Sequence, residues 1–404
     1  MNKNKNRKRT KSVSVEIICY TFRMGKKRDK TILVIIPTGD YAERLKLDGI
    51  LQYAQEKSGA RWNLNLDIGG TVGRHLRRKD NLHYDGIIAY IQSEGERRTI
   101  LDNDLPTVLI EDLLPPSSLP NGKHVVSIVC DHRAEGRTAA RYFLERHYRN
   151  FAFVGTETNT AWSNLRREGF ETELGESGLA CNCYRNGDDL ENWLARLPKP
   201  CALFAVRDLR ARQVLTAAGN AGLSIPQDLA VLGVDNDEIL CKTSLPTLSS
   251  IPTFDRSLGY AAGRALNQLF LARSKGGVIE TRHSQVITRH STDGDAIDDP
   301  FVAKALVWIR KHLDEKLDAK TIAAGISYSA KPLVQRTRQT LGITLSEAVR
   351  RTRVAAAREL LANTTLSVSE IAATCGFANL SHLSLRITEA TGLSPLDYRK
   401  KFLS

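Results

Sequence analysis

The sequence predicts an α/β domain with parallel sheets over residues 31–290 and an all-α domain with two helix-turn-helix units over residues 301–404. Three observations predict this division. Short apolar runs alternate with stretches of helical spacing in the first region, an acidic polar segment follows, and the remaining residues repeat one helical unit. A chain of 404 residues is long enough for two or three domains of ordinary size.

Buried strands are predicted where short apolar runs are bounded by polar or turn residues. These runs are 32–36, 86–91, 107–110, 125–129, 152–154, 202–205 and 231–234. Helices are predicted where apolar and charged residues recur at helical spacing, over 42–57, 136–147, 164–177 and 209–221. Strands that alternate with helices indicate parallel sheets, and continuous apolar runs indicate strands that are covered on both faces.

Positive charge is concentrated at the two ends of the chain. The net charge is +13 overall, +9 for residues 1–30 and +8 for residues 301–404, so that residues 31–300 are mildly acidic at −4. The segment 290–300 reads HSTDGDAIDDP, and this composition predicts a linker over residues 291–300. A basic C-terminal domain on an acidic body indicates a sensor joined to a DNA-binding module.

The first thirty residues form a basic tail with little apolar patterning. Two interpretations stay open: a disordered arm that contacts DNA phosphates, or a segment upstream of a translation start at Met24. No run approaches the roughly 18 apolar residues of a membrane span, and the apolar patch after the basic start is too short for a signal peptide.

The seven cysteines indicate neither a disulfide framework nor a zinc site, because their number is odd and no Cys-x-x-Cys occurs. Free thiols in a cytoplasmic protein are the favoured interpretation. The sequence also has no glycine-rich phosphate loop, metal-ligand cluster or nucleophile motif. We therefore expect a protein without a cofactor that is not an enzyme.

The C-terminal region contains two copies of one helical unit. Glycines repeat at matching distances, with 51 residues from Gly325 to Gly376 and 50 from Gly342 to Gly392. In the second copy, Ser367 and Glu370 have the spacing of a capping box, which predicts a helix that ends at Gly376. A second helix is predicted over 380–390, and its counterpart in the first copy over 330–340. Helix, turn and helix in this order are typical of helix-turn-helix units, whose second helix enters the major groove of DNA.

This region resembles the DNA-binding domain of AraC/XylS-type regulators in the spacing of its two units and in the strings SVSEIAATCGFANLSHLS and GLSPLDYR. The resemblance implies two recognition helices that read successive major-groove segments of double-stranded DNA. Candidates for base contacts are Lys331 and Gln335, and the exposed candidates for DNA contacts in the second unit are Ser381, Ser384 and Arg386. Candidates for phosphate contacts are Arg336 and Arg338. The alternative for each residue is an ordinary solvated helix surface.

The two units differ in charge. Residues 301–360 carry a net charge of +7 and residues 361–404 only +1, because Leu385, Thr388 and Glu389 stand where the family usually has basic residues. The first unit also departs from the family in its core, with Thr337 in place of the usual phenylalanine. The charge predicts that the first unit is the main electrostatic anchor on DNA.

Polar residues follow several predicted strands, at the end where ligands bind in open α/β sheets. The candidate ligand-binding residues are Arg44, Asp131, Trp162, Arg166, Asp208 and Asp235. Carboxylates that accept from hydroxyls, multidentate arginines and a flat aromatic face together favour a sugar. The structural alternatives are helix N-caps for the aspartates, core packing for the tryptophan and solvated surface for the arginines.

The α/β region resembles the effector domain of LacI/GalR-type regulators in GLSIPQDLAVLGVDNDE (222–238), SLPTLSSI (244–251) and RSLGYAAGRAL (256–266). The resemblance implies a two-lobed fold like that of periplasmic sugar-binding proteins, with a cleft and a hinge. It also implies ligand contacts for Arg166 and Asp235. In that family the helix-turn-helix precedes the effector domain, whereas here the DNA-binding unit follows it.

An effector domain of this type followed by an AraC-type domain resembles the bacterial xylose-operon regulators, notably in AVRDLRARQVL (205–215) and the junction over 289–312. The resemblance implies a cytoplasmic homodimer that binds D-xylose and operator DNA, activates pentose catabolic genes with RNA polymerase, and has no membrane partner. Sugar would close the two lobes and reorient the dimer. The alternative is a constitutive DNA-binding regulator whose sensor is degenerate or binds a different ligand.

Overall fold

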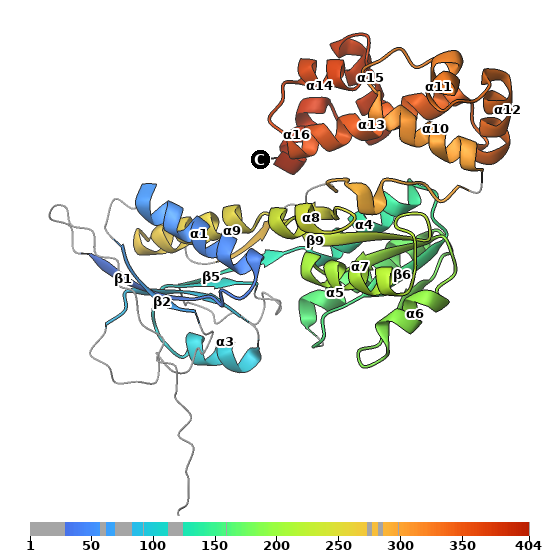
Figure 1. Cartoon of the computed structure of the whole chain (residues 1–404). Coiled ribbons are helices and arrows are strands. Elements are labelled where there is room, and N and C mark those ends of the chain that lie inside the picture. Colours follow the sequence, from blue (N-terminus) through green and yellow to red (C-terminus); the bar gives the residue numbers. More distant parts are fainter. Residues whose placement is uncertain are drawn as a thin grey trace, which may run out of the picture. The chain divides into compact units, whose positions relative to one another are not determined.

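The computed structural model describes residues 29–56, 62–68, 83–91, 93–111, 124–158, 160–272, 277–281, 286–297 and 299–403 (Figure 1). The basic tail with Met24 lies outside the described residues, apart from its last two positions. The chain divides into two compact units. The first contains residues 1–129 and 255–279, and the second contains residues 130–254 and 280–404.

The first unit, which we call the first lobe, is built on a sheet of strand order β11-β5-β4-β3-β1-β2. Its strands are β1 (Lys30–Ile35), β2 (Trp62–Asp67), β3 (Gly86–Tyr90), β4 (Thr107–Ile110), β5 (Val125–Cys130) and β11 (Gly277–Thr281). The pairs from β5 to β2 are parallel. Helices α1 (Tyr41–Glu56) and α9 (Asp255–Phe270) cover one face, and α3 (Glu94–Leu101) lies on the other (Figure 1).

The second unit begins with an α/β part, which we call the second lobe. Its sheet has the order β10-β9-β8-β6-β7, and all these pairs are parallel. Its strands are β6 (Asn150–Val154), β7 (Cys181–Cys183), β8 (Cys201–Ala205), β9 (Leu229–Asp235) and β10 (Ser249–Pro252). Its helices are α4 (His132–Leu144), α5 (Ala161–Glu176), α6 (Leu190–Arg196), α7 (Asp208–Asn220) and α8 (Glu238–Thr243).

Both faces of the second-lobe sheet are covered, as the continuous apolar strands predict. Along β8, Ala202 and Phe204 pack in one core cluster with residues of α4 and α5. Leu203 and Ala205 point the other way, into a second cluster with residues of α6 and α7. These residues of β8 therefore bury their side chains on alternate faces of the sheet, and neither face of this strand is polar.

Each lobe contains one very close crossing of two helices, made possible by reciprocal glycines. In the first lobe a Cβ on Gly49 would lie 1.9 Å from a carbonyl oxygen of α9, and one on Gly259 would lie 1.8 Å from a carbonyl oxygen of α1. In the second lobe the corresponding distances are 2.1 Å for Gly136 on α4 and 2.0 Å for Gly169 on α5. Because the obstacles are backbone atoms, no side chain can be accommodated without separating the helices.

The predicted fold class is confirmed. All seven predicted strands and all four predicted helices of the α/β region are present. Strands β2, β7, β10 and β11 were not predicted. In β2, asparagines alternate with apolar residues at the edge of the sheet, and β7 has only three residues, so neither contains a continuous apolar run.

The segment predicted as a linker over 291–300 is partly built into the second lobe. His290–Thr292 forms a short 3₁₀-helix, and Ser291 and Thr292 are completely buried. The Ser291 hydroxyl donates to the Val231 carbonyl oxygen at 2.6 Å. The connecting segment therefore begins at Asp293, and the first helix of the C-terminal domain begins at Pro300.

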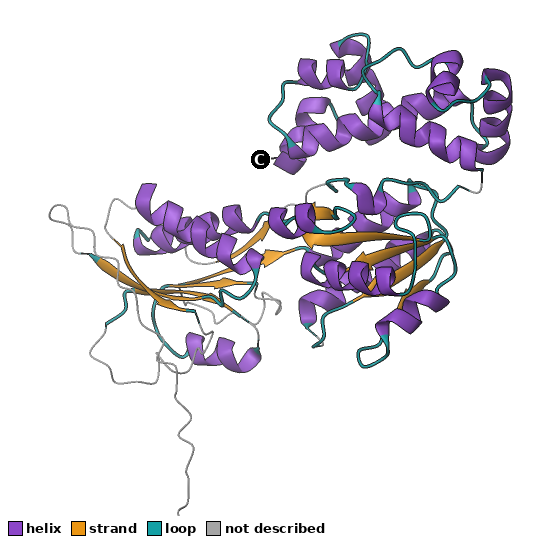
Figure 2. Ribbon diagram, viewed as in Figure 1, coloured by secondary structure: helices purple, strands orange, loops and turns teal. Residues whose placement is uncertain are grey.

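The C-terminal domain contains only helices in its described part (Figure 2). They are α10 (Pro300–Lys311), α11 (Ala319–Gly325), α12 (Ala330–Leu341), α13 (Leu345–Asn363), α14 (Val368–Thr374), α15 (Leu380–Thr391) and α16 (Pro395–Leu403). The predicted capping box is present, since Ser367 and Glu370 bond reciprocally to each other's backbone N–H. The two helix-turn-helix units are α11 with α12 and α14 with α15, and helices are present where the two recognition helices were predicted.

The structure confirms the repeat, but the prediction that Gly325 and Gly376 are equivalent is wrong. Gly342 and Gly392 are equivalent, because both end a recognition helix at a φ near +70° (69° and 71°). The equivalent of Gly376, at φ 66°, is Ser327, at φ 55°, and not Gly325. Gly325 has a different role, because a Cβ there would lie 2.2 Å from the ring of Trp308. In the part of the chain that the structure describes, no helix is long and apolar enough to cross a membrane.

Candidate functional site

The carboxyl ends of β6, β8 and β9 form one edge of the second lobe, because these strands pair in parallel. We call this edge the second-lobe rim. It brings together Arg166 on α5, which follows β6, Asp208, which follows β8, and Asp235 at the end of β9. Three of the predicted ligand residues therefore come from adjacent strands, as the sequence predicted.

Arg166 is the centre of a buried charged cluster. Its Nε lies 2.5 Å from Glu135 Oε2, and its Nη1 donates to the Val206 carbonyl oxygen at 2.6 Å. Its guanidinium carbon lies 5.0 Å from the centroid of the half-buried Trp162 ring. His132 Nδ1 lies 3.0 Å from the same Glu135 oxygen. Arg166, Glu135 and His132 are each at most 6% exposed, so their charges are compensated inside the protein.

The cluster keeps Glu135 ionised. Burial opposes ionisation of this carboxyl, but the charges of Arg166 and His132 and their hydrogen bonds outweigh it and hold the pKa of Glu135 well below its usual range. A fixed arginine beside a flat aromatic ring presents the donors and the apolar face that a sugar requires. Glu135 and His132 were not predicted. Their only sequence signal is a spacing of three on a helix, which is common on ordinary helices.

Asp208 is directed into the protein. It is 1% exposed. Its Oδ2 accepts from the Asp237 backbone N–H at 2.8 Å, and its Oδ1 accepts from the Ser250 hydroxyl at 2.6 Å. Burial raises the pKa of Asp208 to about 7. This geometry makes Asp208 a positioning residue for the loop after β9, and its direct sugar contact stays a prediction.

The loop after β9 has an unusual backbone conformation. Asp235 and Asn236 have φ values of 105° and 51°, in the region that residues with a side chain rarely adopt. The Asn236 backbone N–H donates to the Ser250 hydroxyl at 3.0 Å. Such strain persists only where the surroundings hold it, and it is concentrated at functional sites.

Asp131 and Arg44 lie in positions that fit the structural roles given above as alternatives to sugar binding, a helix N-cap and a solvated surface residue. Asp131 is exposed and caps α4, with Oδ1 accepting from the Ala134 backbone N–H at 3.0 Å. Arg44 belongs to the first lobe, where its Nη1 donates to the carbonyl oxygens of Thr38 and Gly39 at 3.2 and 3.1 Å. Sugar contacts of these two residues stay predictions.

On the first recognition helix, the predicted DNA contacts separate into two groups. Lys331, Gln335 and Arg338 are exposed, and their spacing of four and then three residues places them on one face of α12. Arg336 lies on a different side of the helix, where its Nη1 is 2.6 Å from Asp299 Oδ2, the N-cap of α10. This ion pair connects the recognition helix to the end of the linker.

The second recognition helix presents a different chemistry. Ser381 is exposed and Ser384 half-buried, while Arg386 forms an ion pair of 2.8 Å with Glu389. Leu385 is 53% exposed and occupies on α15 the place that Gln335 has on α12, counted from the equivalent glycines at the helix ends. Leu385 was not among the predicted DNA contacts. The 50-residue repeat could have found it.

The described residues contain no group of three or more histidine, cysteine or acidic side chains that could hold a metal ion. Six of the seven cysteines belong to that part of the chain, and all six are free thiols.

Comparisons with known proteins agree with this architecture. A family of periplasmic binding protein-like domains matches residues 140–292, and a helix-turn-helix domain family matches residues 322–401. The xylose operon regulatory protein of Escherichia coli (strain K12) is 27% identical over 397 residues, which cover 93% of this chain and 98% of the relative. That of Haemophilus influenzae is 25% identical over 378 residues, which cover 88% and 95%. A solved structure described as the xylose-binding transcription activator xylR matches with a TM-score of 0.57 and 25% identity, covering 92% of this chain and 98% of its own.

The chain is therefore a transcription regulator in which a periplasmic-binding-protein-like domain precedes a DNA-binding helix-turn-helix domain. Within this class it is similar over nearly its full length to the xylose operon regulatory proteins of Escherichia coli and Haemophilus influenzae. The resemblance found in the sequence is confirmed.

Proposed function

We propose that this regulator responds to D-xylose, which binds at the second-lobe rim against Arg166 and Trp162. The observation that carries the proposal is the buried Arg166–Glu135–His132 cluster, which fixes a multidentate donor beside an aromatic ring. The relatives of matching length are named for the xylose operon, and the similar solved structure is described as xylose-binding. Asp131, Asp208 and Asp235 are the further candidate ligands on the second lobe.

We infer that the protein acts in the cytoplasm as a homodimer that activates genes of pentose use together with RNA polymerase. A dimer would present four helix-turn-helix units to DNA, and sugar would change their arrangement only if it binds one conformation more tightly than the other. The competing function is a regulator with the same DNA-binding domain whose sensor binds another ligand or none.

A thermal-shift panel of pentoses and hexoses tests the effector. D-xylose is expected to raise the melting temperature by several degrees, since saturation at about 100 times Kd adds about 2.7 kcal/mol to the free energy of unfolding. Trp162→Ala should weaken D-xylose binding by about tenfold or more, because it removes the aromatic face beside Arg166.

Trp193→Ala is the matched control, because Trp193 lies on α6 and packs against Tyr184, away from Arg166. A wild-type shift with another sugar alone would reject D-xylose and keep the sensor. No shift with any sugar would support the competing function.

Substitutions on the recognition helices test the DNA interface. Gln335→Ala is expected to reduce the difference in free energy between specific and non-specific binding by about 1–3 kcal/mol. Arg338→Ala should weaken binding to all sequences and reduce by about one the slope of log binding constant against log salt concentration. Lys331→Ala should resemble Gln335→Ala. Arg336→Ala should reduce DNA affinity less than Arg338→Ala, because Asp299 already holds the guanidinium. The measurement is a salt titration of binding to a DNA fragment that the wild-type protein selects from a random pool.

Leu385 provides a second test on the same DNA. An exposed apolar side chain in the major groove can contact the 5-methyl group of thymine, so replacing one thymine by deoxyuridine should weaken wild-type binding more than binding by Leu385→Ala, whose side chain is shorter. Arg212→Ala, which removes an exposed positive charge from the second lobe, is the control for net charge. Equal losses for all recognition-helix variants, independent of sequence, would reject the division of roles.

A further inference from the structure

A set of buried hydrogen bonds connects the strained loop after β9 to the segment that leaves the second lobe. We propose that Arg289 is the positioning residue through which sugar at the second-lobe rim changes the linker, and thereby the DNA-binding domain. The proposal rests on the proposed sugar response. It adds the route of coupling, which lies entirely in the second unit.

Arg289 holds the loop directly. Its Nη2 donates to Asn236 Oδ1 at 2.7 Å, and its Nη1 donates to the Leu248 carbonyl oxygen at 2.8 Å. Asn236 is the second of the two residues with positive φ, and Asp235, a candidate sugar ligand, is the first. A sugar that bonds to Asp235 would therefore act on a strained peptide whose next side chain is held by one guanidinium.

The backbone of Arg289 is held equally firmly at Ser249. The Arg289 N–H donates to the Ser249 hydroxyl oxygen at 2.7 Å, and that hydroxyl donates back to the Arg289 carbonyl oxygen at 3.0 Å. The Thr292 hydroxyl donates to the Ser249 hydroxyl oxygen at 2.7 Å. One donor and two acceptor positions use the full capacity of a serine hydroxyl. Ser249 and Thr292 are completely buried, and a fully satisfied buried network favours a single arrangement.

A second connection reaches the same point through α4. The Tyr142 hydroxyl shares a hydrogen bond of 2.5 Å with the Thr292 hydroxyl. Tyr142 lies near the C-terminal end of α4, and His132 and Glu135 of the Arg166 cluster lie at its N-terminal end. The buried junction at Thr292 is therefore anchored on α4 as well as on the backbone of Arg289.

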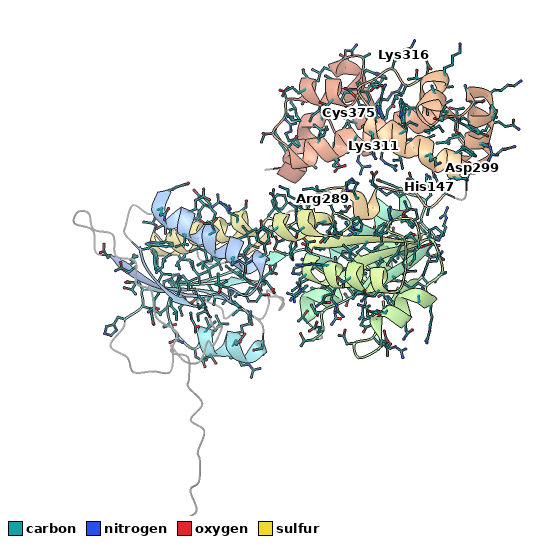
Figure 3. All side chains as sticks on the ribbon, in the orientation of Figure 1. His147, Arg289, Asp299, Lys311, Lys316 and Cys375 are labelled. Atoms are coloured by element: carbon teal, nitrogen blue, oxygen red, sulfur yellow. The ribbon has the colours of Figure 1, made fainter. Side chains whose placement is uncertain are left out.

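The linker then carries carboxylates that pair with the C-terminal domain. Asp293, directly after Thr292, lies 3.6 Å from Lys311 Nζ, and Asp295 lies 2.8 Å from Arg310 Nη1. Asp299 pairs with Arg336 of the first recognition helix at 2.6 Å. Figure 3 labels Arg289, Lys311 and Asp299 along this segment. The loop, Arg289, the buried junction and the paired linker thus form one continuous set of contacts.

Hydrogen–deuterium exchange of the full-length protein with and without D-xylose tests the route. In the wild type, D-xylose should change exchange both at residues 235–240 and at residues 293–312. Arg289→Met keeps the aliphatic stem and removes the donors. It should keep the change at 235–240 and a D-xylose affinity within about threefold of wild type, while losing the change at 293–312.

DNA binding provides the second readout. D-xylose should change wild-type affinity for its selected DNA by about tenfold, a typical size for coupling between two sites, and Arg289→Met should reduce this change to less than about twofold. By linkage, DNA should also stop changing the affinity of the variant for D-xylose. Ser249→Ala, which removes the junction bonds without touching the loop, should act in the same way and provides a second variant if Arg289→Met folds poorly.

Arg212→Met is the matched control, because Arg212 is an exposed arginine on α7 of the same lobe and takes no part in the proposed route. If Arg289→Met and Ser249→Ala keep a wild-type response at 293–312, the route is wrong although the sensor stands. If both variants lose D-xylose binding itself, Arg289 stabilises the sugar site and does not connect that site to the linker. If the wild type responds to no sugar at all, the proposed function fails first, and that result is distinct from the other two.

Discussion

Arg166→Ala is expected to lower the free energy of unfolding by about 3–5 kcal/mol and to abolish stabilisation by D-xylose. The substitution leaves Glu135 buried without the guanidinium that compensates its charge, and an unpaired buried carboxylate is strongly destabilising. It also removes the hydrogen bond to Val206 at the end of β8. Urea denaturation followed by tryptophan fluorescence measures the first effect, and the sugar thermal shift measures the second.

A double variant separates the two effects of Arg166. In Arg166→Met with Glu135→Leu the buried Arg166–Glu135 ion pair is removed as a whole and only His132 of the cluster remains, so most of the lost stability should return, whereas the sugar response should stay absent. Recovery of the sugar response in this double variant would contradict the assignment of Arg166 as a ligand residue.

The double variant should also change how stability depends on pH. The folded-state pKa of Glu135 is lowered, so the stabilisation from its pair is present above the unfolded pKa of about 4.3 and is lost as pH falls towards the folded pKa. The wild type should therefore lose stability below that pH more steeply than the double variant. Urea midpoints measured between neutral pH and pH 3 check this difference.

Gly169→Ala is expected to destabilise the protein by about 3 kcal/mol or more, or to prevent folding of the second lobe. The new Cβ would lie 2.0 Å from the Arg133 carbonyl oxygen, and neither helix backbone can yield without opening the α4–α5 crossing. Arg166 is on the same helix, so any separation of α4 from α5 should also weaken sugar binding.

Gly175→Ala, on the same helix, is the matched control. No atom lies within 4 Å of the position of its Cβ, and alanine is the better helix former, so this substitution should stabilise the protein by about 0.5–1 kcal/mol. Opposite signs for one chemical change on one helix can be measured by urea denaturation. Equal effects at the two positions would contradict the close crossing.

Local chemistry explains which features could be predicted from the sequence. Buried strands such as β8 are uniformly apolar, and the capping box of Ser367 and Glu370 needs only four adjacent residues. The ends of parallel strands necessarily meet at one edge, so the position of the second-lobe rim follows from the order of elements.

Contacts that depend on distant partners could not be predicted in this way. Glu135 becomes part of the site only because the α4–α5 crossing places it against Arg166, 31 residues later. Arg336 has the composition of a phosphate contact, yet Asp299 binds it from 37 residues earlier. The orientation of Asp208 depends on Ser250 and Asp237, which the fold alone brings to it. In each case the sequence shows the chemistry of the side chain, but it does not show which distant residue the side chain contacts.

The unlike recognition helices have a consequence for the regulated gene. One presents lysine, glutamine and arginine at equivalent places where the other presents serine, leucine and threonine. A protein whose two readers differ so strongly selects a DNA sequence with a definite polarity, because reversing the sequence would offer each helix the bases suited to the other. In the proposed homodimer each protomer therefore requires its own half-site in one direction, and binding should depend on the relative direction of the two half-sites as well as on their spacing.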